Sequence, residues 1–122
     1  MTFRRAKNQT LSASVRLAAP PEKVWELITT VGSITEWYDT WDIVEHAAAD
    51  ERLRVGTSFQ LIRHRPGGDD TARCHVTSLQ PPRRLCWLQY APRRPTVAVA
   101  FDLAPAGGGT LLNHTRSWIE SV

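Results

Sequence analysis

The chain reads Leu11-Ser12-Ala13-Ser14-Val15-Arg16-Leu17 before a pair of prolines at positions 20 and 21, and Glu22-Lys23-Val24-Trp25-Glu26-Leu27-Ile28 after them. In the first run apolar and polar side chains alternate, which predicts a half-buried β-strand. In the second run apolar residues recur at helical spacing, behind a proline and a glutamate that suit a helix N-terminus. We therefore expect a strand followed by a short amphipathic helix that ends at Gly32.

Further strand patterns occupy most of the remaining chain. They lie at residues 43–48, 58–64, 72–79, 85–90, 96–103 and 110–118, and a second short helical turn is expected near Trp37. The run at 96–103 alternates most strictly, with Val97, Val99, Phe101 and Leu103 on one face. Clusters of proline and glycine separate the runs, which is typical of an antiparallel sheet joined by turns.

This order of elements, together with several short motifs, resembles the START-like (SRPBCC, polyketide cyclase/dehydrase) superfamily over residues 9–118. The motifs are Ala19-Pro20-Pro21-Glu22-Lys23-Val24-Trp25, Trp37, Gly56 before a strand, Pro81-Pro82-Arg83-Arg84-Leu85 and Gly108-Gly109-Thr110. The resemblance implies an α+β helix-grip fold, with a curved antiparallel sheet of about seven strands and two short helices after the first strand. It also implies a cavity for an apolar or aromatic small molecule, and leaves the chemistry open.

Length and composition fit a single domain. The 122 residues suffice for one core, 42% of them are hydrophobic, and no apolar run approaches the ~18 residues of a membrane span. We expect a flexible arm at residues 1–9 and one START-like domain at residues 10–122. Because no signal-peptide pattern is visible near the first residues, a cytoplasmic location is expected.

The C-terminal end departs from the superfamily pattern. The resemblance implies a long helix after the last strand, but only Ile119-Glu120-Ser121-Val122 follow Trp118. We therefore expect this helix to be truncated or absent. Soluble monomers rarely expose a large apolar face, so a homodimer in which the partner helps to close the cavity is predicted.

Neither a disulfide nor a metal site is expected. If the hairpin across Pro81-Pro82 pairs Leu79 with Arg84, Cys74 lies opposite Gln89 and Cys86 opposite Thr77, on different rungs and opposite faces of the sheet. The four histidines are scattered, without a carboxylate or cysteine at a metal-ligand spacing. We therefore expect no metal and no cofactor.

Alternate connections of an up-and-down antiparallel sheet lie at the same end, so segments 37–42, 65–70 and 91–95 are expected to cluster. The cluster brings arginines close to three aromatic residues: Arg63, Arg65, Arg93 and Arg94 beside Trp37, Tyr38 and Trp41. Aromatic walls with a cationic rim suit an aromatic or acyl ligand that carries an anionic tail. The alternative reading, in which these arginines are ordinary solvated charges, stays open at this stage.

The register of the last hairpin decides which side chains face the cavity. If Leu103 pairs with Thr110, His114 and Arg116 share the inner face with the apolar residues, and they then need partners or a ligand. A one-residue slip would turn both toward solvent. The expected ligand-binding residues are Trp37, Tyr38, Trp41, Phe59, Leu61, Arg63, Trp87, Val99, Phe101, Leu112 and Trp118.

Two classes of function fit such a cavity. In the cyclase and aromatase branch, the resemblance implies that polar cavity residues hold a poly-keto chain and assist aldol closure and dehydration. His114 is then the expected general acid or base, and Arg116 the group that polarises a carbonyl or holds an enolate. The alternative is a non-catalytic carrier that sequesters a hydrophobic small molecule or lipid.

The expected partners follow from these two classes. They are an aromatic or hydrophobic small molecule and, for a biosynthetic cyclase, an acidic acyl carrier protein. A formal charge of +3 and 13 arginines against 2 lysines raise the question of nucleic-acid binding. Since no RNA-binding motif and no stripe of interleaved basic and aromatic residues accompany this charge, nucleic acid is not an expected partner.

Overall fold

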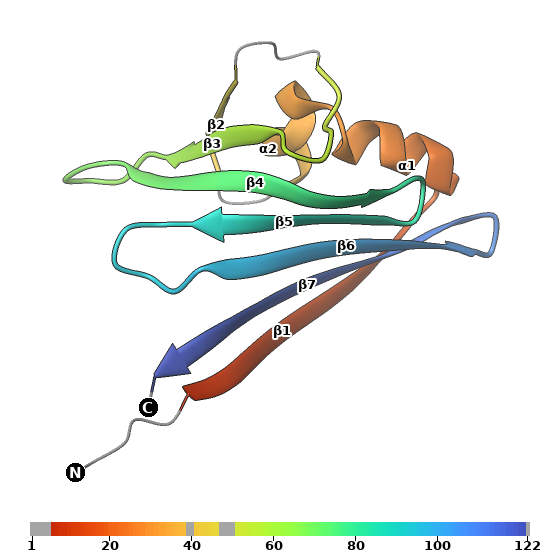
Figure 1. Cartoon of the computed structure of the whole chain (residues 1–122). Coiled ribbons are helices and arrows are strands. Elements are labelled where there is room, and N and C mark those ends of the chain that lie inside the picture. The colour runs from red at the N-terminus through yellow and green to blue at the C-terminus, as the bar shows by residue number, and fades with distance from the viewer. Residues whose placement is uncertain (1–5, 39–40, 47–50, 122) are drawn as a thin grey trace.

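The computed structural model, which describes residues 6–38, 41–46 and 51–121, contains one seven-stranded antiparallel sheet and two short α-helices (Figure 1). The helical elements are α1 (Pro21–Ile28), the 3₁₀ turn η1 (Val31–Ser33) and α2 (Ile34–Trp37). The strands are β1 (Ala6–Leu17), β2 (Ile43–Glu45), β3 (Ser58–Arg63), β4 (Asp70–Gln80), β5 (Arg84–Tyr90), β6 (Val97–Ala106) and β7 (Gly109–Ser121). Their spatial order is β1-β7-β6-β5-β4-β3-β2. The α+β helix-grip fold expected from the sequence is confirmed.

Several boundaries differ from the predicted ones. Strand β1 already begins at Ala6 and pairs along its length with β7, so the expected arm at residues 1–9 extends too far; residues 1–5 lie outside the described residues. Strand β2 is only Ile43–Glu45 long, and the end of the predicted strand at residues 47–48 is likewise not described. Strand β7 continues to Ser121, beyond the predicted end at residue 118.

Helix α1 ends at Ile28, earlier than the predicted end at Gly32. The hydroxyls of Thr29 and Thr30 donate hydrogen bonds to the carbonyl oxygens of Trp25 and Glu26, at 2.7 and 2.8 Å. Such bonds from side chain to backbone compete with a regular helix, which explains why the chain turns here. Val31 is fully buried nevertheless, as the helical spacing predicted.

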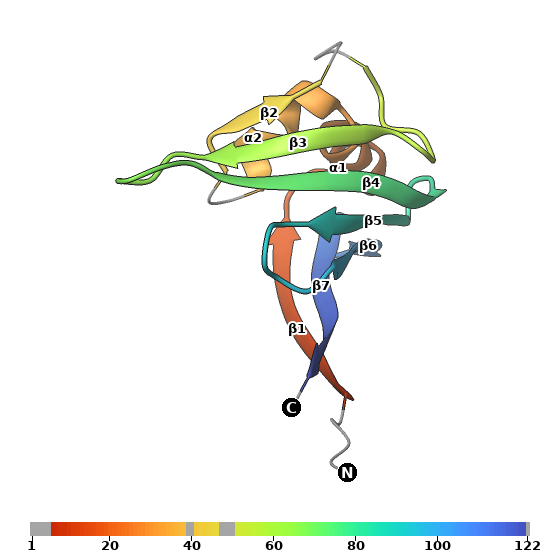
Figure 2. The ribbon, with the colours of Figure 1, turned by 60° about the vertical axis from the view of Figure 1, so that its left-hand side comes forward.

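One face of the sheet and the helices together form a single core. Val24, Trp25 and Ile28 point from α1 into it, and Ile34 is buried at the start of α2. The sheet contributes alternate residues of the central strands: Ala72, Cys74, Val76, Leu85, Trp87, Val99 and Phe101. The twist of the sheet turns β1 and β7 away from the direction of β3 and β4 (Figure 2).

The β6–β7 register settles which residues face the helices. Leu103 pairs with Leu112, two residues from the predicted partner Thr110. A two-residue difference preserves the alternation of faces, so His114, which pairs with Phe101, and Arg116 still share the inner face with the apolar residues.

The β4–β5 hairpin contains a bulge. Cys74 pairs with Gln89, as predicted, but the register shifts between Val76 and Ser78. Ser78, and not the predicted Thr77, therefore lies opposite Cys86, because a bulge places one extra residue in β4. Both cysteines are free thiols.

Strand β1 forms the edge of the sheet, and its inner face is open. Leu11 and Val15, on the same face as the core, are 62% and 49% exposed. The homodimer, which was expected because a missing C-terminal helix would leave an apolar face uncovered, stays a prediction.

Candidate functional site

An apolar cavity of about 320 Å³ lies between β1, α2, β6 and β7. Its lining residues are Ala13, Ser14, Val15, Trp37, Tyr38, Phe101, Leu112, His114 and Arg116. Strands β6 and β7 form the sheet side of this cavity, because the pleat directs Phe101, His114 and Arg116 to the same face. The 3₁₀ turn and α2 bring Trp37 and Tyr38 over that face, and the two rings are 5.6 Å apart.

His114 lies among aromatic rings in this cavity. Its imidazole stacks on Phe101, with ring centroids 4.6 Å apart and planes 13° from parallel, and its edge meets Tyr38 at 5.6 Å. Burial, and then the charge of Arg116, lowers the pKa of His114 below its ordinary value. The ring is therefore neutral at neutral pH. Its Nε2 is buried and has no hydrogen-bond partner among the described residues, and the same holds for Nε1 of Trp37.

A hydrogen-bond network stands behind this cavity. The Tyr38 hydroxyl and Nε1 of Trp87 both donate to Oε1 of Gln89, at 3.1 and 3.2 Å, and the Cys74 thiol donates to the same oxygen at 3.7 Å. Burial raises the pKa of the Cys74 thiol well above its usual range, so it remains a protonated donor. Because an indole N–H can only donate, the amide atom that faces Trp87 must be the oxygen.

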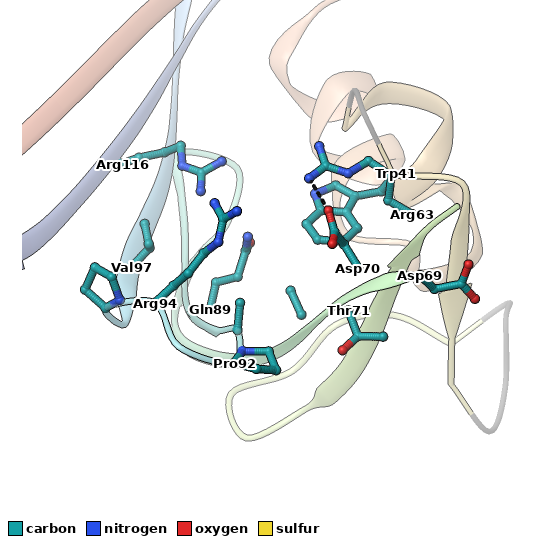
Figure 3. A pocket seen from close by; sticks show the side chains of 13 residues that line it. Trp41, Arg63, Asp69, Asp70, Thr71, Gln89, Pro92, Arg94, Val97 and Arg116 are labelled. Carbon is teal, nitrogen blue, oxygen red and sulfur yellow. Dashed lines mark hydrogen bonds and ion pairs between the residues drawn. The ribbon is translucent and has the colours of Figure 1, made fainter. Parts of the chain in front are cut away.

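A second cavity, of about 370 Å³, opens at the end of the sheet where the β3–β4 and β5–β6 turns meet (Figure 3). Its residues come from the predicted segments and from the strands beside them: Trp41, Arg63, Asp69, Asp70, Thr71, Ala72, Gln89, Ala91, Pro92, Arg94, Pro95, Val97 and Arg116. The clustering of the three connections that was expected from the up-and-down order is therefore found at this end. Arg116 lines both cavities.

The arginines at this end differ from the predicted rim. Arg63 and Arg65 both bind Oδ2 of Asp70 at 2.7 Å, and the hydrogen bond from Arg63 in particular holds the pKa of Asp70 below its usual range. The Arg63 guanidinium also lies 5.4 Å from the centre of the Trp41 ring, a cation–π contact. Arg93, in a left-handed conformation with φ of 60°, is exposed and lines neither cavity. Of the four arginines expected at this rim, Arg63 and Arg94 line the cavity, whereas Arg65 and Arg93 do not.

The other predicted site residues divide into three groups. Trp37, Tyr38, Phe101 and Leu112 line the apolar cavity, while Trp41 and Arg63 line the second one. Phe59, Leu61, Trp87 and Val99 are almost completely buried in the core behind the cavities. Trp118 lies farther along β7, where it lines a shallow hollow with Pro95 and Ile119.

Gln89 and Asp70 are two of the cavity residues that were not predicted as part of the site. Gln89 stands at a buried position of the inner face of β5, and a polar residue in an apolar alternation is a signal that could have indicated it. Asp70 carries no such signal, because its role comes from the conformation of the Arg65–Asp70 turn, which a sequence pattern does not specify.

The described residues contain no group of three histidine, cysteine or carboxylate side chains that could hold a metal ion. None of the described helices is long and apolar enough to cross a membrane.

Fold and cavities together define a helix-grip domain of the START-like superfamily. Residues 18–121 match the family described as "Activator of Hsp90 ATPase homolog 1-like protein", and the chain belongs to this family. No curated protein matches the sequence.

Solved structures share the fold at low sequence identity. Protein CV1439 from Chromobacterium violaceum is 19% identical with a TM-score of 0.73, and the match covers 91% of this chain and 80% of that one. CalU16 from Micromonospora echinospora is 24% identical with a TM-score of 0.66, over 95% and 69% of the two chains. DynU16, a putative protein in the dynemicin biosynthetic locus, is 21% identical with a TM-score of 0.68, over 89% of this chain and 37% of that one. At such identities the likeness concerns the fold alone.

Proposed function

We propose that the protein binds a small molecule with an aromatic or otherwise apolar body in the cavity beside His114. One observation supports this more than any other: Nε2 of His114 and Nε1 of Trp37, in two residues that line the cavity, are buried and have no hydrogen-bond partner among the described residues. A buried polar atom without a partner costs about 1–3 kcal/mol, so a ligand that supplies a hydrogen bond there regains this free energy. The surrounding rings of Tyr38 and Phe101 provide flat apolar surfaces for the body of the ligand.

The comparisons are compatible with this proposal. The resemblance to the superfamily implies a cavity for an apolar small molecule, and DynU16 is a putative protein in the dynemicin biosynthetic locus. The proposed function applies that general property to the particular cavity between β1, α2, β6 and β7.

The test uses a bulky residue placed in the cavity from its open side. Ala13 of β1 lines the cavity and is exposed, so Ala13→Trp fills the space without disturbing the core. Ser12→Trp puts the same side chain on the opposite face of β1 and serves as the control. With 4-(2-naphthyl)butan-1-ol as the probe and isothermal titration calorimetry as the readout, Ala13→Trp should abolish binding and Ser12→Trp should preserve it. Equal affinity of both variants would refute the proposed site.

A second candidate function is acid–base catalysis in the same cavity. The observation that favours it is the neutral, unpartnered His114 next to the positive charge of Arg116. In an aldol closure of a poly-keto chain, His114 would take a proton from a methylene between two carbonyls, and Arg116 would hold the enolate oxygen. The enolate carbon then attacks a distant carbonyl of the chain, and the proton on His114 passes to the alkoxide that forms. Loss of this hydroxyl group together with a hydrogen of the neighbouring carbon, as one water, forms the new double bond.

One variant distinguishes the binding function from the catalytic function. His114→Gln keeps a polar side chain of similar reach but cannot exchange a proton near neutral pH. For a catalyst, a poly-β-keto thioester analogue should still bind while cyclised product no longer forms; for a carrier, no product forms with either protein. The acidic acyl carrier protein, the homodimer and the cytoplasmic location remain predictions that accompany this proposal.

A further inference from the structure

We infer that the ligand of the apolar cavity carries an oxyanion, a carboxylate or a phosphate, that binds between Arg94 and Arg116. This inference rests on the proposed function, because it assigns the second cavity to the polar end of the same ligand. Arg116 lines both cavities, so a molecule whose apolar body lies against Phe101 and His114 can extend past Arg116 into the second one.

The balance of charge around the second cavity singles out these two arginines. Arg63 and Arg65 share Asp70, and His64 is hydrogen-bonded to Asp69 at 3.0 Å, so the charges of this turn are largely compensated. Arg94 is near enough to Asp70 to help lower the pKa of that carboxyl, but it forms no ion pair with it. Among the residues that the structure describes, neither Arg94 nor Arg116 has an ion pair or a hydrogen bond to a side chain.

The geometry brings these two charges to one place. Figure 3 shows the guanidinium groups of Arg94 and Arg116 directed into the same space, although the first comes from the β5–β6 turn and the second from β7. Both side chains line that cavity together with Gln89. Two guanidinium groups that converge from separate elements match the several lone pairs of a carboxylate or phosphate.

Gln89 adds a neutral donor to the same place. Its oxygen is occupied by Tyr38 and Trp87, which leaves the amide NH₂ group for the cavity side. The amide therefore supplies donors to an anion without adding charge.

A solvated surface charge would explain Arg94 alone, since its side chain is exposed, but it does not explain Arg116. Arg116 is half-buried at the rim of an aromatic cavity, and its charge lowers the pKa of His114. A partly desolvated cation without a counter-charge is unfavourable, so an anion bound beside it improves the electrostatic energy of the site.

The experiment compares two probes that share an apolar body: 4-(2-naphthyl)butanoate and 4-(2-naphthyl)butan-1-ol. The wild-type protein should bind the acid about tenfold more tightly than the alcohol or better, as expected for charge-assisted hydrogen bonds. Arg94→Gln and Arg116→Gln should each remove most of this preference, measured in each variant as the ratio of its affinities for the acid and the alcohol. Arg93→Gln, in the same turn but outside the cavity, is the matched control and should keep the preference.

Each outcome decides a different point. Equal binding of acid and alcohol by the wild type, or a preference that survives in both Arg94→Gln and Arg116→Gln, overturns the inference and leaves the proposed function intact. Failure of both probes to bind overturns the proposed function itself. If circular dichroism shows that Arg116→Gln is unfolded, Arg94→Gln against Arg93→Gln decides alone. The corresponding naphthylbutyl phosphate, added as a third probe, distinguishes a phosphate from a carboxylate as the preferred oxyanion.

Discussion

The Tyr38 hydroxyl donates a hydrogen bond across 3.1 Å to Oε1 of Gln89, and this bond joins the segment after α2 to the C-terminal end of β5. Each of the two side chains is only 5% exposed. Burial raises the pKa of Tyr38 to about 12, so the phenol stays protonated and continues to donate at physiological pH. Tyr38 lines the apolar cavity and Gln89 the charged one, so this bond fixes the wall between them.

Loss of the acceptor should cost more than loss of one donor. Gln89→Leu leaves the hydroxyl of Tyr38 and the indole N–H of Trp87 buried without an acceptor, which should lower the free energy of unfolding by about 2–4 kcal/mol. Tyr38→Phe removes one donor while Trp87 still satisfies the oxygen, so its cost should be nearer 1 kcal/mol. Urea denaturation of the two variants measures the difference; equal losses would mean that Gln89 is not the shared acceptor.

The stability of the protein should fall on mild acidification because of His114. Its pKa is lowered in the folded protein, so below pH ~6.5 the unfolded chain takes up a proton that the folded chain does not. The contribution of His114 to the free energy of unfolding should therefore have its full value above pH 6.5. It should decrease, by up to about 1.4 kcal/mol per pH unit, as the pH falls from 6.5 to the pKa of His114 in the folded protein. Urea denaturation at several pH values between 7.5 and 5 should show this decrease, and His114→Gln should remove most of it.

His64 provides the matched control for the pH experiment. Its hydrogen bond to Asp69 raises its pKa, so any stabilisation it gives is present at low pH and is lost as the pH rises through the folded pKa. Its side chain is exposed, which makes this contribution small. His64→Gln should thus leave the acid-induced decrease in place. NMR titration should find the two imidazoles on opposite sides of 6.5, and a His114 pKa above that value would contradict the buried, neutral ring.

The alternation of apolar and polar residues was enough to predict most of the fold, because it indicates which side chains each strand buries. Val97, Val99, Phe101 and Leu103 define a strand on their own, and the parity of the pattern put His114 and Arg116 on the inner face although the predicted pairing was two residues out. Parity is robust to such an error because both registers bury the same side chains. The bulge near Ser78 was not predictable in this way, because one unpaired residue leaves the alternation on either side nearly unchanged.

The candidate site was less predictable than the fold, because its charges depend on conformations rather than patterns. The sequence places arginines at two turns, but whether a guanidinium meets a carboxylate depends on how each turn folds. Asp70 forms ion pairs with both Arg63 and Arg65, while Arg93, at a positive φ, does not line the cavity. Arg116, which was predicted for a catalytic role, is the residue that connects the two cavities.

Gly109 should be the least replaceable glycine of the last hairpin. A β-carbon at this position would overlap the carbonyl oxygen of Leu17, because the end of β1 passes directly beside it. Gly109→Ala must push the two strands apart, which should cost about 1–3 kcal/mol of unfolding free energy in a urea titration. Gly108 has open space around it and a φ of 83° that asparagine tolerates, so Gly108→Asn is the control and should cost less. The close approach would be disproved if the two variants were equally stable.

Removal of the Asp70 charge should strengthen the binding of an anion. Without this carboxylate, Arg63 and Arg65 lose their partner and add positive potential to the cavity of Arg94 and Arg116. Asp70→Asn should therefore bind 4-(2-naphthyl)butanoate a few-fold more tightly, with no change for the alcohol, and the gain should shrink as salt is added. Because the ion pairs are partly exposed, the free energy of unfolding should change little.

Asp102 offers a control of the same chemistry at another place. It also binds an arginine, Arg84, at 2.7 Å, but it lines a different hollow, with Cys86 and Thr115, and neither of the two cavities. Asp102→Asn changes the net charge of the protein equally and should leave the affinity for the acid unchanged at moderate salt, since the added potential arises outside the cavity. A gain of the same size in both variants would show that overall charge, and not Asp70, controls anion binding. Weaker binding in Asp70→Asn would show instead that the carboxylate holds Arg63 and Arg65 in place for the ligand.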